Sequence, residues 1–128
     1  MLFRSFIEED LKQLMKVSYQ DTVTFTPNIQ YGKVLRVLSP RDIIIASRIY
    51  NGYTKVLKPK LYRFHIILSN IPYFGVKDDE IREELTKMIL NNIVVINNMY
   101  THAESNMIFA EIYLNGLDVN NFLLSLYE

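Results

Sequence analysis

Residues 33–50, "KVLRVLSPRDIIIASRIY", decide the fold of this chain. Two runs rich in β-branched residues, "KVLRVL" and "DIIIASRIY", flank a polar kink at residues 39–42. A third run of the same kind, "LYRFHIIL" at residues 61–68, follows a connection that contains Asn51 and Gly52, a pair typical of hairpin turns. The three runs predict a meander of antiparallel strands.

An amphipathic helix is expected at the N-terminal end. Within residues 3–17 apolar residues recur at three- and four-residue spacing, and acidic residues precede the lysines. Ser5 followed by Glu8 resembles a capping box at the start of such a helix. The polar stretch that follows, up to residue 30, is expected to be an extended lead-in to the strands.

Helix and strand alternate in the second half of the chain. The acidic pair at residues 78–79 starts a helix that ends near Asn91. Two more strands follow, "IVVI" at residues 93–96 and "NMIFAEIYL" at residues 106–114, and residues 117–128 are expected to be helical. Three strands, a helix, two strands and a helix is the order of a five-stranded barrel of the oligonucleotide/oligosaccharide-binding (OB) type.

We therefore expect an α+β protein with two parts. Residues 1–30 form the N-terminal helix and lead-in, and residues 31–128 form the barrel domain. The chain has 128 residues, 49% of them apolar, which is enough for one hydrophobic core. It has no cysteine, no apolar run near the roughly 18 residues of a membrane span, and acids where a signal peptide would be apolar. These features predict a soluble intracellular protein that is not secreted.

The net charge of zero hides a segregation of charge along the chain. Residues 33–63 hold eight basic residues and one acidic residue, so this segment carries +7. The remainder holds six basic and thirteen acidic residues and carries −7. A basic segment is typical of a surface that binds nucleic acid or another anionic partner. The alternative is that Lys and Arg decorate strand edges and hairpin tips to block aggregation.

Three stretches resemble the staphylococcal-nuclease-like family. Residues 62–71, "YRFHIILSNI", are similar to the family's strand "Y-K-F-x-V-R-L-x-G-I". Residues 83–96, "EELTKMILNNIVVI", are similar to its helix followed by "G-K-I-V-x-V". Residues 107–124, "MIFAEIYLNGLDVNNFLL", are similar to "R-L-L-A-x-V-Y-x-D-G-x-x-V-N-x-x-L", with Ala, Tyr, Gly and Val-Asn at the family spacing. The resemblance covers roughly three quarters of the chain, from "GKVLRVL" onward, and is in particular to members from large DNA viruses.

The resemblance implies a calcium-assisted hydrolysis of phosphodiester bonds in the family, in which carboxylates hold the ion, a glutamate activates water and two arginines clamp the phosphate. The first metal ligands lie in the family turn "D-G-D-T", which is "S-P-R-D" here. Without a gap, the family aspartates fall on Ser39 and Arg41, and the threonine falls on Asp42. A cationic Arg41 would repel calcium. A shift of one residue would return Asp42 to the metal position.

The second family element, "R-L-x-G-I-D-T-P-E", supplies an arginine, a metal aspartate and the glutamate base. Two alignments of this element are open. Matching on "YRF" places the three residues at Ile67, Pro72 and Gly75. Matching on the proline places them instead at His65, Asn70 and Tyr73. Neither alignment supplies a carboxylate.

The second family arginine falls on Met107, and no basic residue occurs after Lys87. Loss of one charge-stabilising donor typically costs about a hundred- to a thousand-fold in rate, and here the base, the metal ligands and both arginines are missing together. The resemblance therefore implies a pseudo-nuclease that is not an enzyme and needs no metal or other cofactor.

Other chemistry has little support in the sequence. His65 lies in an alternating strand and His102 in a polar turn, where structural roles are more common than catalytic ones. No glycine-rich phosphate loop, HExxH or Ser-His-Asp signature occurs. Tyr50, Tyr53 and Tyr62 lie within the basic segment and would allow base stacking, although most aromatic residues in a domain this small serve packing.

Two function classes follow from these observations. The first is a catalytically inactive nuclease-like domain that serves as a structural or protein-binding module, with the N-terminal helix as a docking element. The viral resemblance makes a minor or internal capsid protein the concrete version, in the virion and in the cytoplasm or virus factory. The second is a non-catalytic nucleic-acid binder that contacts the backbone through Arg36, Arg41, Arg48, Lys55, Lys58, Lys60 and Arg63. An active calcium-dependent nuclease is the remote alternative.

Overall fold

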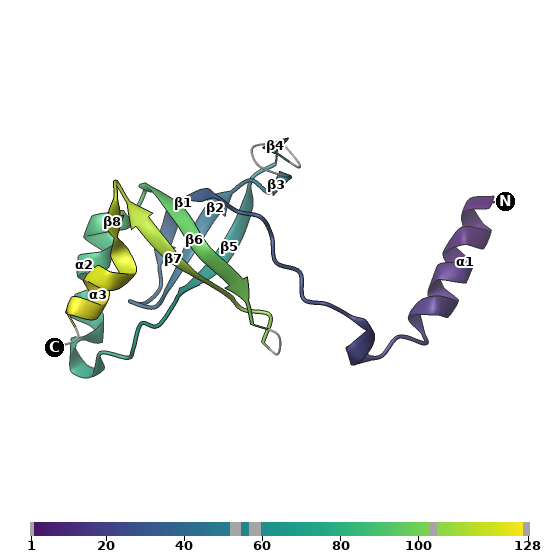
Figure 1. Cartoon of the computed structure of the whole chain (residues 1–128), viewed down its shortest axis with the longest axis horizontal. Helices are drawn as coiled ribbons and strands as arrows, with labels where there is room; N and C mark the ends of the chain where they lie inside the picture. The colour runs from purple at the N-terminus through teal and green to yellow at the C-terminus, as the bar shows by residue number, and fades with distance from the viewer. Residues whose placement is uncertain (1, 52–54, 57–59, 103–104, 127–128) are drawn as a thin grey trace.

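Five strands close into a barrel in the computed structural model, which describes residues 2–51, 55–56, 60–102 and 105–126 (Figure 1). The barrel strands are β1 (Tyr31–Val37), β2 (Asp42–Ser47), β5 (Tyr62–Leu68), β6 (Ile93–Thr101) and β7 (Ile108–Leu114). The pairs β1–β2, β2–β5, β1–β6 and β6–β7 are antiparallel, and a parallel pair, β5–β7, closes the ring. The chain is thus α+β, and its strand order is that of an OB-type barrel.

The barrel forms because each strand alternates between core and surface. In β2 the side chains of Ile43 and Ile45 are fully buried, whereas Ile44 between them points outward. Gly32 on β1 lies so close to β2 that an added Cβ would meet Ile45 Cδ1 at 2.8 Å and the Ala46 carbonyl oxygen at 3.0 Å, so a larger residue there would require Ile45 to move. The helices α2 (Asp78–Ile89) and α3 (Val119–Ser125) lie at one end of the barrel (Figure 1). They fill the core with buried side chains from one face each: Ile81, Leu85, Ile89, Val119 and Leu123.

The first helix, α1 (Leu2–Leu14), stands apart from the barrel (Figure 1). Ser5 lies inside this helix, so the predicted capping box at Ser5 is wrong; the helix begins three residues earlier. A 3-10 turn, η1 (Tyr19–Asp21), and an extended lead-in connect α1 to β1. The lead-in is held along β6, where the Ile96 N–H donates to the Gln30 carbonyl at 2.9 Å.

Two strand predictions are corrected by the structure. The second strand ends at Ser47, and the residues after it form a separate hairpin of β3 (Tyr50–Asn51) and β4 (Lys55–Val56). The strand predicted at residues 93–96 continues to Thr101, because a bulge at Asn98, whose φ is 49°, lets the pairing with β7 resume. Two further short elements complete the described chain: η2 (Gly75–Lys77) and β8 (Leu117–Asp118).

Asn120 on α3 ties together the strands that close the barrel. Its Oδ1 accepts from the Ile112 N–H at 3.1 Å, and its Nδ2 donates to the carbonyls of Ser69 at 3.1 Å and Ala110 at 3.3 Å. Ser69 directly follows β5, and the other two partners lie on β7. Asn120 is buried, so these bonds satisfy backbone groups that water cannot reach.

Replacing Asn120 with leucine should therefore destabilise the barrel. Leucine has a similar volume but leaves the Ile112 N–H and the Ser69 carbonyl without this partner, each at a cost of about 1–3 kcal/mol, whereas the Ala110 carbonyl still accepts from the Ser69 N–H. We expect the free energy of unfolding, measured by urea denaturation, to fall by about 2–4 kcal/mol. The matched control is Asn121→Leu on the exposed side of the same helix, which should change stability by less than about 0.5 kcal/mol. Equal effects from the two substitutions would contradict this role.

Candidate functional site

The kink at residues 39–42 is a tight turn between β1 and β2. The Asp42 N–H donates to the Ser39 carbonyl at 3.4 Å, and the Arg41 N–H donates to Ser39 Oγ at 3.0 Å. Asp42 is the first residue of β2, and its Oδ2 lies 3.7 Å from His65 Nε2 on β5. Its Oδ1 is buried and has no hydrogen-bond partner among the described residues. Asp42 is thus a turn residue, and its carboxylate lies beside the His65 imidazole.

Arg41 bridges this turn to the loop after β5. Its Nη1 and Nη2 donate to the two carboxylate oxygens of Asp78 at 2.7 and 2.9 Å, and Nη1 also donates to the Pro72 carbonyl at 3.1 Å. The guanidinium lies 5.4 Å from the centre of the Tyr73 ring, within cation–π distance. Asp78 begins α2, where the helix dipole favours a negative charge. One cation thus links three segments of the chain.

The ion pair also sets the protonation of its members. The hydrogen bonds from Arg41, with a further one from the Phe74 N–H, hold the pKa of Asp78 below its usual value. In return, the Asp78 carboxylate raises the pKa of Arg41. Both groups are therefore charged over a wide range of pH. This bidentate geometry is the strongest form of a guanidinium–carboxylate contact.

The positions that the resemblance assigns to the nuclease site are near one another in the barrel. Ile67 pairs directly with Asp42, and Met107 precedes the residue of β7 that pairs with Ile66. Asn70 and Gly75, in the loop after β5, both adopt positive φ angles. Across residues 2–51, 55–56, 60–102 and 105–126, no three His, Cys, Asp or Glu side chains gather as a metal site requires. The cation present at this end of the barrel is the chain's own Arg41.

A groove opens on the outer face of β1, β2 and β5. It holds about 660 Å³. Its apolar lining consists of Leu35, Leu38, Ile44 and Phe64. Its polar lining consists of Arg36, Arg63 and His65. The register explains this composition, because Arg36, Ile44 and His65 form one row across the three strands. We call this surface the β1–β2–β5 groove.

The predicted basic contacts divide between several places. Arg36 and Arg63 line the β1–β2–β5 groove, whereas Arg41 is held by Asp78. Arg48 lines a smaller neighbouring hollow of about 230 Å³, together with Lys33. The remaining predicted contacts are Lys60, which is exposed, Lys55, which lies in β4, and Lys58, which lies outside the described residues. Lys33 also belongs to the basic segment; it lines the smaller hollow and lies in one row across the strands with Ala46 and Arg63.

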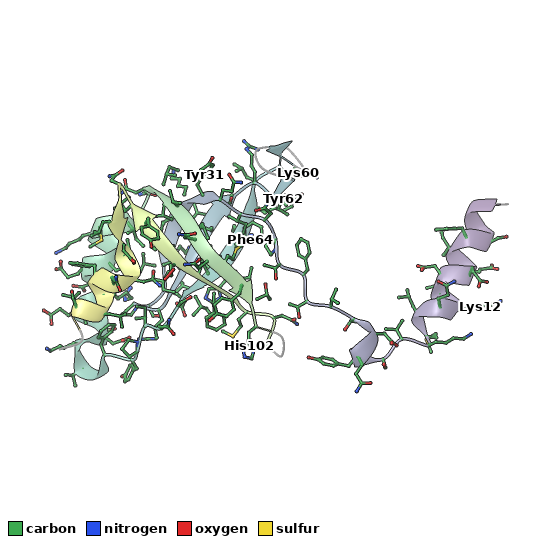
Figure 2. All side chains as sticks on the ribbon, in the orientation of Figure 1. Lys12, Tyr31, Lys60, Tyr62, Phe64 and His102 are labelled. Carbon is green, nitrogen blue, oxygen red and sulfur yellow. The ribbon has the colours of Figure 1, made fainter. Side chains whose placement is uncertain are left out.

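Aromatic residues contribute little to the groove. Phe64 lines it, and Tyr62 lies 6.4 Å from Phe64 between ring centres; Figure 2 shows Tyr62 and Phe64 on β5, with Lys60 just before the strand. Tyr53 lies outside the described residues, and Tyr50 lies in β3. The groove therefore offers one partly buried ring and no exposed stacking platform among the described residues.

No family model matches this chain, and no curated protein matches it. The relation to staphylococcal-nuclease-like proteins therefore stays a prediction from the sequence. The described helices include none with the length and apolar character to cross a membrane. The function must be inferred from the groove, the ion pair and α1.

The Arg41–Asp78 ion pair should give the protein an acid-sensitive stability. The folded-state pKa of Asp78 lies below the unfolded value of about 3.9, so the stabilisation is complete above that value and is lost as the pH falls through the folded-state pKa. We expect Asp78→Asn to lower the free energy of unfolding by about 1–2 kcal/mol at pH 7 and to flatten its decline below pH 4. The measurement is urea denaturation from pH 7 to pH 2.5. Asp79→Asn, one residue along the same helix turn, is the control and should keep the wild-type slope.

Proposed function

We propose that this protein is a non-catalytic binding module whose helix α1 docks on another protein. The observation that carries the proposal is the exposed apolar face of α1. Phe6 is 73% exposed, and Leu11 and Leu14 are each 56% exposed, although they follow one another along a single face. Contiguous exposed apolar surface of this kind is typical of protein interfaces.

The length of α1 supports the same conclusion. Isolated helices shorter than roughly 12–15 residues are marginal in water, and most helices in proteins are stabilised by packing of an apolar face. α1 has 13 residues, and its apolar side chains from Phe6 to Leu14 are exposed. The barrel core is complete without them, because it is filled by the strands, α2 and α3. A partner that covers this face would supply the packing that the barrel does not.

The charge pattern of α1 favours a protein over a lipid surface. Helices that lie on anionic membranes carry Lys and Arg on their polar side. α1 instead carries three consecutive acids in its middle, Glu8, Glu9 and Asp10. With Arg4 and Lys12 the helix carries −1 in total, so it lacks the excess of cations that attracts anionic lipid, whereas a protein partner can present cations complementary to the three acids.

The ion pair at the turn supports the absence of catalysis. Arg41 stands where the resemblance expects a metal-binding aspartate, and its positive charge opposes a divalent cation there; its bonds to Asp78 and Pro72 hold the guanidinium in that place. The scaffold of a nuclease-like barrel would then serve as a structural element. The resemblance to proteins of large DNA viruses suggests a minor or internal capsid protein as the setting for this role.

A second candidate function is non-catalytic binding of nucleic acid in the β1–β2–β5 groove. The observation that favours it is the presence of Arg36 and Arg63 in one groove, on a face that OB-type barrels use for oligonucleotides. Lys33 extends this basic surface to the neighbouring hollow. The described lining of the groove has no exposed Tyr, Phe or Trp ring for base stacking, and Asp78 holds Arg41, so nucleic-acid binding is the weaker candidate.

Fluorescence anisotropy with a labelled single-stranded DNA separates the two candidates. With calcium present, we expect no saturable binding at physiological salt and an intact oligonucleotide on a gel afterwards. Arg36→Glu/Arg63→Glu is the matched variant, because nucleic-acid binding in the groove would be lost in it and would show a salt slope of roughly −0.7 per phosphate neutralised.

The alternative results are equally decisive. Saturable binding that weakens with salt and disappears in the double variant would replace protein docking with nucleic-acid binding. A cleaved oligonucleotide would overturn the non-catalytic assignment, and loss of cleavage in Asp42→Ala would then place the reaction at the turn between β1 and β2.

A further inference from the structure

We propose that the partner of α1 is a second copy of this chain, in which α1 of one copy lies in the β1–β2–β5 groove of the other. This inference rests on the proposed function and names the protein that α1 docks on. The two surfaces belong to the same chain and complement each other in both apolar surface and charge. The contact is a helix in an apolar groove, one of the recurring ways in which proteins bind helical segments.

The groove combines apolar side chains with arginines, which suits an amphipathic helix that carries an acidic residue on its apolar face. Four apolar side chains line it, and one of them, Leu38, is 47% exposed. Arg36 and Arg63 stand on β1 and β5, the two strands that flank β2, so they border the apolar lining provided by Ile44. A purely apolar helix would leave these cations partly desolvated without a counter-charge, which is unfavourable.

The face of α1 has the matching composition. At 100° per residue, Asp10 lies one turn from both Phe6 and Leu14 and falls within the same arc as Ile7 and Leu11. The apolar face therefore carries one carboxylate near its centre. A partner that covers this face must supply a cation to Asp10, because burial of an unpaired carboxylate is costly. The arginines of the groove meet that requirement.

The anchoring of the lead-in favours exchange between copies over folding back onto the same barrel. The lead-in is fixed to β6 by the bond between Ile96 and Gln30 and by Thr26 Oγ1, which donates to Thr101 Oγ1 at 2.6 Å. These anchors lie beyond the N-terminal end of β1, whereas Arg36 lies toward its C-terminal end. α1 consequently stands apart from its own barrel (Figure 1), and Lys12 lies well apart from Phe64, which lines the groove (Figure 2).

Reciprocal docking would give a closed dimer. If α1 of each copy enters the groove of the other, both contacts are identical and related by a two-fold axis, so no binding surface of this kind is left free. Two helix-in-groove contacts form together, and the second benefits from the high local concentration that the first creates.

The test is sedimentation velocity of the full chain, with charge reversals on either side of the contact. We expect the wild-type protein to dimerise and both Asp10→Arg and Arg63→Glu to weaken dimerisation by at least about 30-fold, because each places like charges together. Mixing the two variants should restore a dimer. In that heterodimer the arginine at position 10 meets the glutamate at position 63, and the native Asp10 meets the native Arg63.

Two controls make the result specific. Glu9→Arg changes the charge on the polar side of the same helix, and Lys77→Glu reverses an exposed cation remote from the groove; neither should alter dimerisation. Circular dichroism of each variant checks that the fold is retained, which we expect because the side chains of Asp10 and Arg63 are exposed.

Each contrary outcome overturns the inference. A wild-type monomer at all concentrations excludes self-docking, as does a dimer that survives both reversals. Failure of the mixture to dimerise would also contradict the inference, because reciprocal docking pairs the two reversed charges across the interface. The proposed function is judged separately by the DNA experiment, so a monomer that ignores DNA leaves α1 a docking element for a different protein.

Discussion

The parallel pairing of β5 with β7 is the constraint on which the structure depends. It joins Ile66, Ile67 and Leu68 to Ile108, Phe109 and Ala110, residues that are about forty positions apart in the chain. Parallel strands cannot be joined by a tight turn, so the intervening chain must cross over, and here it does so through α2 and β6. Asn120 then bonds to the backbone on both sides of the closure. The single long-range pairing turns a curved sheet into a barrel with a sealed core.

The closure also leaves part of β5 with one strand partner. β7 pairs with only the last part of β5, whereas β2 pairs with β5 from Tyr62 to Ile67. The first half of β5 is therefore covered on one edge only, and Arg63, Phe64 and His65 lie in this half and line the groove. The cations of the groove come from outward positions of strands whose inward positions form the core.

Much of the fold follows from local patterns, and the remainder depends on contacts between distant residues. The five barrel strands, α2 and the end of that helix near Asn91 are predicted by alternation, apolar spacing and turn residues, and the structure has them. The sequence pattern could not predict that β6 continues past its bulge. The asparagine at the bulge, Asn98, is a residue typical of turns and has a positive φ, so locally it looks like the end of a strand. Nor could they predict that Asp78 holds Arg41, since the two residues are 37 positions apart and each fits an ordinary local role, one in a helix cap region and one in a turn.

The fold distributes the basic residues of segment 33–63 over several places on the protein. The basic segment does not form one patch, because Asp78 neutralises Arg41 while Arg36 and Arg63 stay on the groove. If the cations served only to block aggregation, they would lie on strand edges and hairpin tips. Arg36 and Arg63 instead lie on the face of the sheet beside apolar side chains. The acid that suits them lies in the apolar face of α1. Because the whole chain has no net charge, two copies can approach without mutual repulsion, and local complementarity then decides how they meet.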